Sequence, residues 1–301
     1  MASNSRVNNV LDMVKNIPSE GEFEQFEDLP YYANIAVDHI QGYGRGTIAG
    51  KTYYVLTHSL RNKDEGRIIF SDNLEGDHIE IHAPDGVWHP AGVQFIGDYA
   101  FVSSSGRKAH VYDVCKVMNK QTTEPVATYS VRGGTCLGIA DFYRDSKHYY
   151  LLMMVESQDT CVAYIAEDTG DIAKLTFEEK GSYYLENHNY TTQGIGLVTD
   201  INENVFMIVT EIRGEGTTYG DYINLYPLCI GSDMSVVVKD SQRVVRHLVN
   251  KGGLAGVDGS HFRWGPGIEV TSDGTINVLT TSRNIIAGTH LNTTVWKGKI
   301  K

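Results

Sequence analysis

The chain has 301 residues, of which 41% are hydrophobic and 21% are charged, and this composition is typical of a globular protein rather than a disordered or fibrous one. Its formal net charge of -11 at pH 7 argues against binding to nucleic acid, because that binding depends on clustered lysine and arginine. The longest apolar stretch, Tyr149 to Val155, is far shorter than the roughly 20 residues of a membrane-spanning helix. We therefore expect a soluble protein that binds neither nucleic acid nor membrane.

Residues 1–20 predict a polar leader followed by a short amphipathic helix between Val7 and Ile17. This segment lacks the basic start and the apolar core of a secretory signal, which indicates a cytoplasmic location. The four cysteines show no C-x-x-C spacing, and three of them fall within predicted strands. Buried, reduced thiols are the expected result.

A short pattern, in which a glycine opens an apolar strand, recurs five times. The glycines are Gly42, Gly92, Gly138, Gly194 and Gly267, at intervals of 50, 46, 56 and 73 residues. Such spacing is typical of a repeat architecture with one small sheet per repeat. Because no linker rich in proline, glycine or serine divides the chain, we expect one structural unit over residues 21–301.

Each of the first four repeats predicts four short antiparallel strands separated by turn residues. The first repeat has them at 40–48, 51–57, 67–71 and 77–82. The second has them at 91–96, 99–103, 110–114 and 125–131. The third has them at 137–142, 148–155, 161–165 and 172–177, and the fourth at 194–199, 205–212, 221–229 and 236–247.

The fifth repeat supplies only three strands, at 267–271, 275–281 and 293–300. The segment from Glu22 to Phe26 has the apolar and polar alternation needed for the missing outer strand, and its pairing there would close the ring. The predicted fold class is all-β, a five-bladed β-propeller closed by an N-terminal strand. Over essentially the whole chain this pattern resembles tachylectin-type lectins, arabinanase-like glycosidases and plant-type glutaminyl cyclases, without a catalytic signature of any of them.

Polar side chains gather where the first strand of each repeat begins and where the second strand ends, two points that meet at one mouth of a propeller channel. The first group comprises Asp38, His39, Gln41, His89, Thr135, Thr191, Gln193, His261, Arg263 and Trp264. The second group comprises His58, Ser59, Ser103 to Ser105, Glu156, Glu211 and Arg283. Either these strand ends simply reach solvent or they line a ligand pocket, and for the set as a whole we expect the pocket.

Glu156 and Glu211 occupy matching places in adjacent repeats, so their carboxyls could flank one substrate bond as general acid and as base or nucleophile. The resemblance to arabinanase-like glycosidases implies three acidic residues from separate blades, and Asp38 and Asp141 are further carboxylates near the same channel. The alternative is that both glutamates pair with arginine or lysine on neighbouring loops.

His39, His89 and His261 open three different repeats. Imidazole nitrogens from separate strands can meet on an axis and hold a divalent cation, with Gln193 or a carboxylate completing the shell. Such a set is similar to the manganese site of oligogalacturonate lyases. The expected cofactor is a divalent metal ion, manganese, zinc or calcium, and the alternative is no cofactor. The alternative is that each histidine is a hydrogen-bonded structural residue.

The string from His261 to Gly267 contains Trp264, which either offers a flat platform for a sugar or plugs the channel as part of the core. Arg263 adds a fork of hydrogen-bond donors. Arg283 either clamps a carboxylate or phosphate or forms a structural ion pair. Together with His58, Gln193 and Asp38, these three residues are the expected substrate contacts.

The sequence thus predicts an enzyme, a hydrolase or lyase, that acts on a small polar, sugar-like molecule by acid-base or metal-assisted chemistry. Its expected catalytic residues are Glu156, Glu211, His39 and His89. The alternative is a non-catalytic, lectin-like or scaffolding propeller. The five openings carry His, His, Thr, Thr and Trp, and this divergence favours one pocket over five equivalent ones. A small-molecule ligand is the expected partner, and the oligomeric state stays open.

Overall fold

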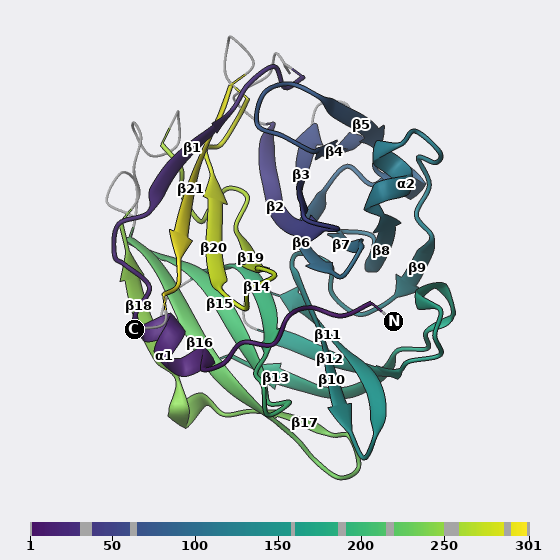
Figure 1. The fold of residues 1–301 in the computed structure, drawn as a ribbon, viewed down its shortest axis with the longest axis vertical. Helices are drawn as coiled ribbons and strands as arrows, with labels where there is room; N and C mark the ends of the chain where they lie inside the picture. The colour runs from purple at the N-terminus through teal and green to yellow at the C-terminus, as the bar shows by residue number, and fades with distance from the viewer. Residues whose placement is uncertain are drawn as a thin grey trace.

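The computed structural model describes residues 2–30, 38–60, 65–157, 160–185, 191–214, 220–249, 259–285 and 290–299. In this part of the chain, five antiparallel sheets stand around a central channel as the blades of a β-propeller (Figure 1). The predicted all-β, five-bladed fold is therefore confirmed. No helix among the described residues is both long enough and apolar enough to cross a membrane.

Blades 1 to 3 each contain four strands in chain order from the channel outward. Blade 1 comprises β2 (His39–Ile48), β3 (Lys51–Leu60), β4 (Glu65–Ser71) and β5 (His78–His82). Blade 2 comprises β6 (Pro90–Ile96), β7 (Tyr99–Ser104), β8 (Lys108–Asp113) and β9 (Ala127–Ser130). Blade 3 comprises β10 (Leu137–Arg144), β11 (Lys147–Ser157), β12 (Thr160–Glu167) and β13 (Glu178–Tyr184).

Blade 4 has a divided outer edge, and blade 5 joins the two ends of the chain. Blade 4 comprises β14 (Thr191–Thr199), β15 (Val205–Arg213), β16 (Gly220–Ile230), β17 (Val236–Val238) and β18 (Val244–Leu248). Blade 5 comprises β19 (Gly267–Val270), β20 (Ile276–Thr281), β21 (Leu291–Lys297) and β1 (Glu22–Phe26). β1 pairs antiparallel with β21, with Glu22 opposite Val295 and Phe26 opposite Leu291, so the predicted closing strand is confirmed.

The recurring glycines mark where the first strands of neighbouring blades touch. A Cβ atom on Gly42 of β2 would overlap the carbonyl oxygen of Ala91 in blade 2. A Cβ atom on Gly267 of β19 would overlap the carbonyl oxygen of Tyr43 in β2, which joins the last blade to the first. Only glycine permits this close approach of two backbones. The repeat in the sequence is therefore a packing requirement of the channel wall.

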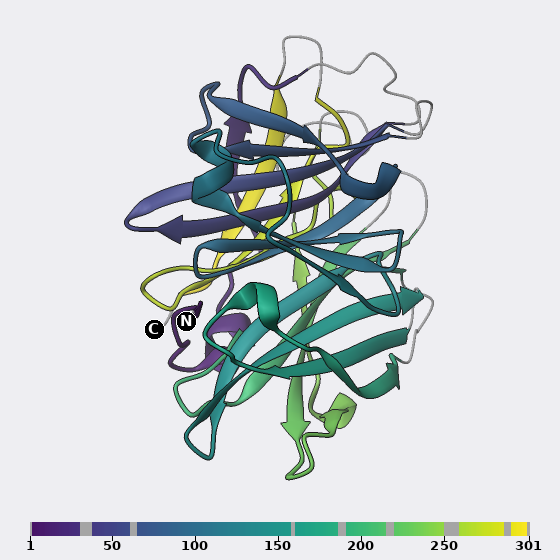
Figure 2. The same cartoon turned by 90° about the vertical axis from the view of Figure 1, so that its right-hand side faces the viewer.

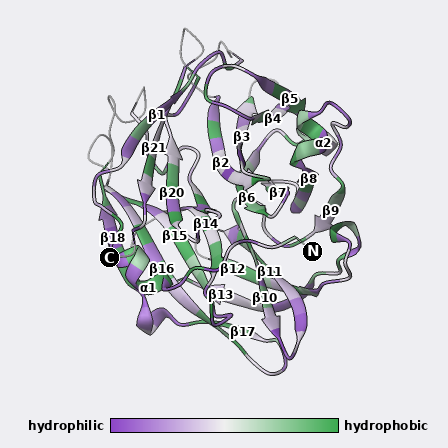
Figure 3. Ribbon diagram, viewed as in Figure 1, coloured by the Kyte–Doolittle hydropathy of each residue, from purple (hydrophilic) through white to green (hydrophobic). Residues whose placement is uncertain are grey.

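The apolar core consists of layers between neighbouring blades, which is why both faces of the inner strands carry apolar residues. One layer joins blades 3 and 4 around Met153 and Met207, and another joins blades 5 and 1 around Tyr43 and Leu279. Three further layers lie between the other blade pairs. Figure 3 shows hydrophobic residues recurring along β16 and β20.

The N-terminal segment is packed against the propeller. Its helix α1 (Val10–Lys15) is shorter than the predicted span and is capped by Asn9, whose side chain accepts a hydrogen bond from the Asp12 N–H. Val10, Met13 and Val14 are buried in the layer between blades 4 and 5. Residues before the helix cross the end of the channel where β2 finishes, as Figures 1 and 2 show.

Three outer strands differ from the prediction. In blade 3 the strand expected at 172–177 is β13, at Glu178–Tyr184. Ile172 and Leu175 are instead buried between blades 2 and 3, and residues Ile172–Lys174 form a 3-10 turn capped by Asp171. β13 lies at a half-exposed sheet edge and carries little apolar signal.

In blade 2 the third strand ends at Asp113, whose side chain caps a helix that was not predicted, α2 (Val114–Met118). The strand expected at 125–131 is β9, at Ala127–Ser130. In blade 4 the strand expected at 236–247 is divided into β17 and β18, which pair with different halves of β16 and are separated by a 3-10 turn at Asp240–Gln242.

Candidate active site

One end of the channel, which we call the mouth, is formed by the starts of the first strands and the ends of the second strands. Antiparallel pairing dictates this arrangement: in blade 1, His39 lies opposite Ser59, and Ile40 lies opposite His58. In Figure 2, β2 runs from right to left and finishes on the side where the N-terminus lies. The mouth is therefore at the other end of the channel from the N-terminal segment.

Blades 1, 2 and 5 bring an aromatic cluster together at the mouth. The ring centroid of His39 lies 5.1 Å from that of Trp264 and 6.3 Å from that of His89. Trp88 extends the cluster, with its ring centroid 5.0 Å from that of His89. Gln41 Nε2 is hydrogen-bonded to His39 Nε2. The predicted convergence of His39, His89 and Trp264 is present in the structure.

Bulges in the first strands position side chains at the mouth, and this feature was missed in the sequence. The pairing register shifts between Ile40 and Gly42 in blade 1 and between Thr192 and Gly194 in blade 4. The extra residues are Gln41 and Gln193, each directly before a recurring glycine. A bulge redirects one side chain out of the regular alternation and is common beside active sites. The recurring Gln-Gly pair was the sequence signal from which these bulges could have been predicted.

Two arginines flank the indole ring of Trp264. The guanidinium carbon of Arg263 lies 5.1 Å from the ring centroid, and that of Arg283 lies 5.0 Å from it. Burial, and then the positive charge of Arg263, lower the pKa of Arg283. The Arg283 carbonyl accepts a hydrogen bond from Ile40 N–H at 2.8 Å, which ties blade 5 to blade 1. Trp264 is only 8% exposed, so its burial fits a core ring and not an open platform.

Three histidines at the mouth have lowered pKa values. His58 is 1% exposed, and burial followed by the charge of His39 lowers its pKa to about 3. Burial also lowers the pKa of His89. Burial followed by the charge of Arg263 lowers the pKa of His261 to about 4. These three imidazoles are therefore neutral at pH 7.

A buried Asp221–His261 pair was not predicted. His261 Nδ1 lies 3.1 Å from Asp221 Oδ1 and accepts a hydrogen bond from the Arg263 N–H at 3.1 Å. Asp221 Oδ1 also accepts a hydrogen bond from the Phe262 N–H at 3.2 Å. The start of β16 thus fixes the loop that carries Arg263 and Trp264. Because the two residues are 40 positions apart in the sequence, no local sequence pattern predicts that they pair.

The two predicted catalytic glutamates lie in different surroundings. Glu211, near the end of β15, is 7% exposed, and its Oε2 lies 3.4 Å from Arg213 Nη2. Glu156, near the end of β11, is exposed, and its Oε1 lies 3.7 Å from Arg132 Nε. Arg132 also contacts Glu179 at 3.1 Å. The alternative of ion pairing with arginine therefore fits both glutamates.

The remaining predicted residues have clear positions. Asp38 is 6% exposed and directly precedes β2, and Gln193 is half-buried at the start of β14. The expected divalent metal stays a prediction. The described residues contain no group of three or more His, Cys, Asp or Glu side chains placed to hold a metal ion, so His39, His89 and His261 do not form such a group there.

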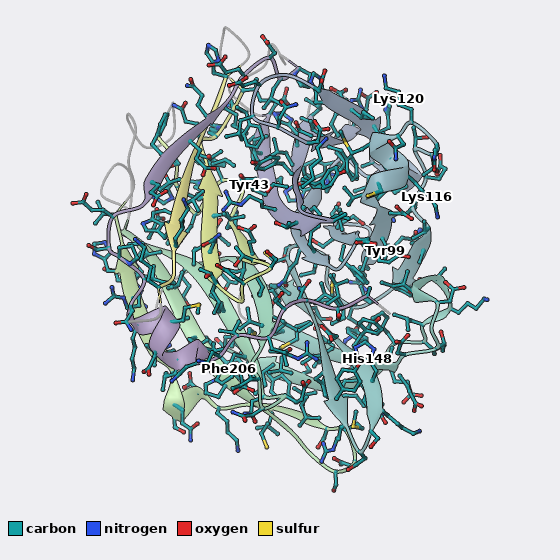
Figure 4. All side chains as sticks on the ribbon, viewed as in Figure 1. Tyr43, Tyr99, Lys116, Lys120, His148 and Phe206 are labelled. Carbon is teal, nitrogen blue, oxygen red and sulfur yellow. The ribbon has the colours of Figure 1, made fainter. Side chains whose placement is uncertain are left out.

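Asp141, expected near the same channel, lies at the end of the channel opposite the mouth. It is 1% exposed, and its carboxylate accepts hydrogen bonds from the Asn4 N–H and from Arg6 Nη1. His148, labelled in Figure 4, contacts the same carboxylate through Nε2 at 3.0 Å. Asp141 therefore anchors the N-terminal segment and does not belong to the mouth.

Comparisons with known proteins agree with the propeller fold. No family model matches the sequence, and a search of curated proteins found no match. The structure is similar to a GH62 hydrolase in complex with xylotriose, with a TM-score of 0.57 and 8% identity over 92% of this chain and 98% of that one. It is also similar to an α-L-arabinofuranosidase from Podospora anserina in complex with cellotriose, with a TM-score of 0.55 and 8% identity over 94% of this chain and 99% of that one. These similarities show a shared fold, in line with the resemblance to arabinanase-like propellers.

Proposed function

We propose that this protein is a glycoside hydrolase that acts on a small sugar at the mouth of the channel. The observation that carries the proposal is the convergence of His39, His89 and Trp264 from three blades at one mouth. These side chains differ in type from one blade to the next. Such a set is expected of one pocket that binds a single ligand rather than of a lectin with equivalent sites in every blade. The fold shared with a hydrolase bound to xylotriose and with an arabinofuranosidase bound to cellotriose adds support.

Glu211 is the proposed proton-transfer group. Its nearly complete burial excludes bulk water from the carboxyl, and Arg213 at 3.4 Å holds its orientation. Glu156, on the neighbouring blade, is the second candidate carboxyl. The lowered pKa of His89 leaves a neutral ring, which can donate a hydrogen bond to a sugar hydroxyl through one nitrogen and accept one through the other.

The test is hydrolysis of a panel of aryl glycosides, with pentofuranosides, pentopyranosides and hexopyranosides compared. We expect Glu211→Gln to lower kcat on the preferred substrate by about 10²- to 10⁴-fold. Glu156→Gln has a matched control in Glu179→Gln, because both glutamates pair with Arg132. Full activity in both the Glu211→Gln and the Glu156→Gln variants would defeat these assignments.

A lectin-like binding module is the second candidate, and one observation favours it. Each proposed catalytic glutamate lies beside an arginine, which is also the arrangement of a purely structural carboxylate. Sugar binding measured by calorimetry, without hydrolysis of any glycoside in the panel, would support this candidate against the hydrolase.

A further inference from the structure

The mouth carries a pair of arginines held by one aromatic ring. Arg263 and Arg283 come from different parts of blade 5, yet their guanidinium carbons lie 5.1 Å and 5.0 Å from the centroid of Trp264. Arg263 is exposed and Arg283 is half-buried. A guanidinium placed against an indole ring keeps its hydrogen-bond donors while losing conformational freedom. The indole ring of Trp264 therefore supports two guanidinium groups, each about 5 Å from its centroid.

The pair stands out because the chain as a whole is acidic, with 37 acidic and 26 basic residues. Burial, and then the positive charge of Arg263, lower the pKa of Arg283, so the two guanidiniums influence each other electrostatically. Asp38, which is 6% exposed, directly precedes β2, and the Ile40 N–H of that strand donates a hydrogen bond to the Arg283 carbonyl at 2.8 Å.

Three of the histidines at the mouth, His58, His89 and His261, add no positive charge at neutral pH. The pKa values of His58 and His261 are lowered to about 3 and about 4, and that of His89 is also lowered. The arginine pair carries its charge on guanidinium groups, which match the geometry of carboxylate and phosphate oxygens and stay charged at any physiological pH.

We infer that the mouth selects an acidic sugar, whose carboxylate or phosphate oxygens are bound by Arg263 and Arg283. The inference rests on the proposed function, because that proposal names a sugar as the ligand. The arginine pair then explains a preference for a negatively charged sugar. Trp264 then acts as a support for the guanidiniums and not as the surface on which the sugar stacks, in agreement with its 8% exposure.

The test measures binding to the full chain by isothermal titration calorimetry. The probes are glucuronic acid, galacturonic acid and glucose 6-phosphate, with glucose and galactose as neutral counterparts. We expect at least one acidic sugar to bind tenfold or more tightly than its neutral counterpart, and its affinity to fall as salt is added. The carboxylated and the phosphorylated probes distinguish the two sources of the anion.

Variants locate the binding. Arg263→Gln and Arg283→Gln are each expected to weaken binding of the acidic sugar by about tenfold or more, because each removes charge-assisted hydrogen bonds. Arg263 is exposed, so its replacement leaves the packing intact. Arg243→Gln is the matched control: its guanidinium also lies against an aromatic ring, that of Tyr226 at 6.0 Å, but on the outer part of blade 4, and the affinity should stay unchanged.

Three results would overturn the inference: equal affinity for acidic and neutral sugars, unchanged affinity in Arg263→Gln, or binding of inorganic phosphate as tight as that of the acidic sugars. If the protein gives any of these results and still hydrolyses neutral glycosides, the proposed hydrolase activity is retained and only the preference for acidic sugars is rejected. If acidic sugars bind tightly and this binding depends on the arginines, but no acidic or neutral glycoside is hydrolysed, the preference for acidic sugars is supported and the proposed hydrolase activity is rejected.

Discussion

Arg6 reaches Asp141 across 135 positions of sequence, and Nη1 of the arginine lies 3.0 Å from Oδ2 of the aspartate. The same arginine forms a two-pronged contact with Glu203, at 2.9 Å and 2.8 Å. Asp141 is 1% exposed, so this carboxylate depends on its partners for the hydration that it has lost. The N-terminal segment is thereby fastened to blades 3 and 4 at the far end of the channel.

Arg6→Gln should destabilise the fold. Removal of one partner leaves the buried carboxylate of Asp141 short of a charge-assisted contact, and a loss of about 2 to 4 kcal/mol in the free energy of unfolding is expected. Urea denaturation followed by circular dichroism measures it. The exposed pair between Lys147 and Glu167 provides the control, because Lys147→Gln should cost less than about 1 kcal/mol. Equal effects in the two variants would contradict the buried anchor.

Gly42→Ala tests the contacts of the channel wall. The added methyl group would meet the backbone of Ala91, which cannot move without shifting blade 2, and we expect a loss of about 1 to 3 kcal/mol or more in the free energy of unfolding. Gly106→Ala is the control, because Gly106 lies in an exposed turn where the added methyl group would approach only side-chain atoms of Val87 and Ser104, at 3.3 Å and 3.6 Å, and no backbone. A Gly42→Ala protein as stable as the Gly106→Ala protein would count against the role given to the recurring glycines.

The buried histidines predict acid sensitivity. The pKa values of His58 and His261 are lowered to about 3 and about 4, whereas an unfolded chain titrates its histidines near 6.5. Between these values the unfolded state binds more protons than the folded state, so stability is complete above about pH 6.5 and decreases as the pH falls toward 4.

Thermal unfolding from pH 8 to pH 4 measures this effect. Each histidine should contribute a slope of about 1.4 kcal/mol per pH unit in the sensitive range. His58→Phe should reduce the slope, provided that the variant folds. For the unmodified protein, ring proton signals of His58 that stay constant in NMR spectra down to pH 5 would agree, and a midpoint near 6.5 would refute the assignment.

Asn224→Leu is expected to stabilise the protein. Asn224 of β16 is fully buried, and both polar atoms of its side chain lack a hydrogen-bond partner in the part of the chain that the structure describes. An unpaired buried amide costs about 1 to 3 kcal/mol, and leucine has a similar volume without that cost. Urea denaturation of the variant decides: a lower midpoint than that of the original protein would indicate that Asn224 has a partner, such as a bound water.

The sequence contained enough information for the ring and for part of the mouth. Gly42 and Gly267 recur because backbones touch there, and His39 and His89 open strands whose starts the topology must bring together. The position of Asp141 was also predictable. It lies four residues beyond Leu137, and a strand rises about 3.3 Å per residue, so it is roughly 13 Å from the mouth.

Other features had no local signal. The contact between Asp221 and His261 joins distant segments, and so does the contact between Arg6 and Asp141. β13 gave no alternating pattern because it is a half-exposed edge strand, whereas the apolar residues before it, such as Ile172, pack between blades without pairing. Secondary structure follows local pattern, but these pairings depend on tertiary packing that a window of residues does not contain.

Because blade 5 takes β1 from one end of the chain and β21 from the other, the ring cannot close before residue 297 has left the ribosome. Phe26 is 1% exposed in the finished protein, yet throughout synthesis its strand has no partner to cover it. Blades 1 to 4 can form in order as they emerge, each on the one before. β1 is thus made before blades 1 to 4 but is paired only after them, and until then its unpaired edge is open to association with other chains.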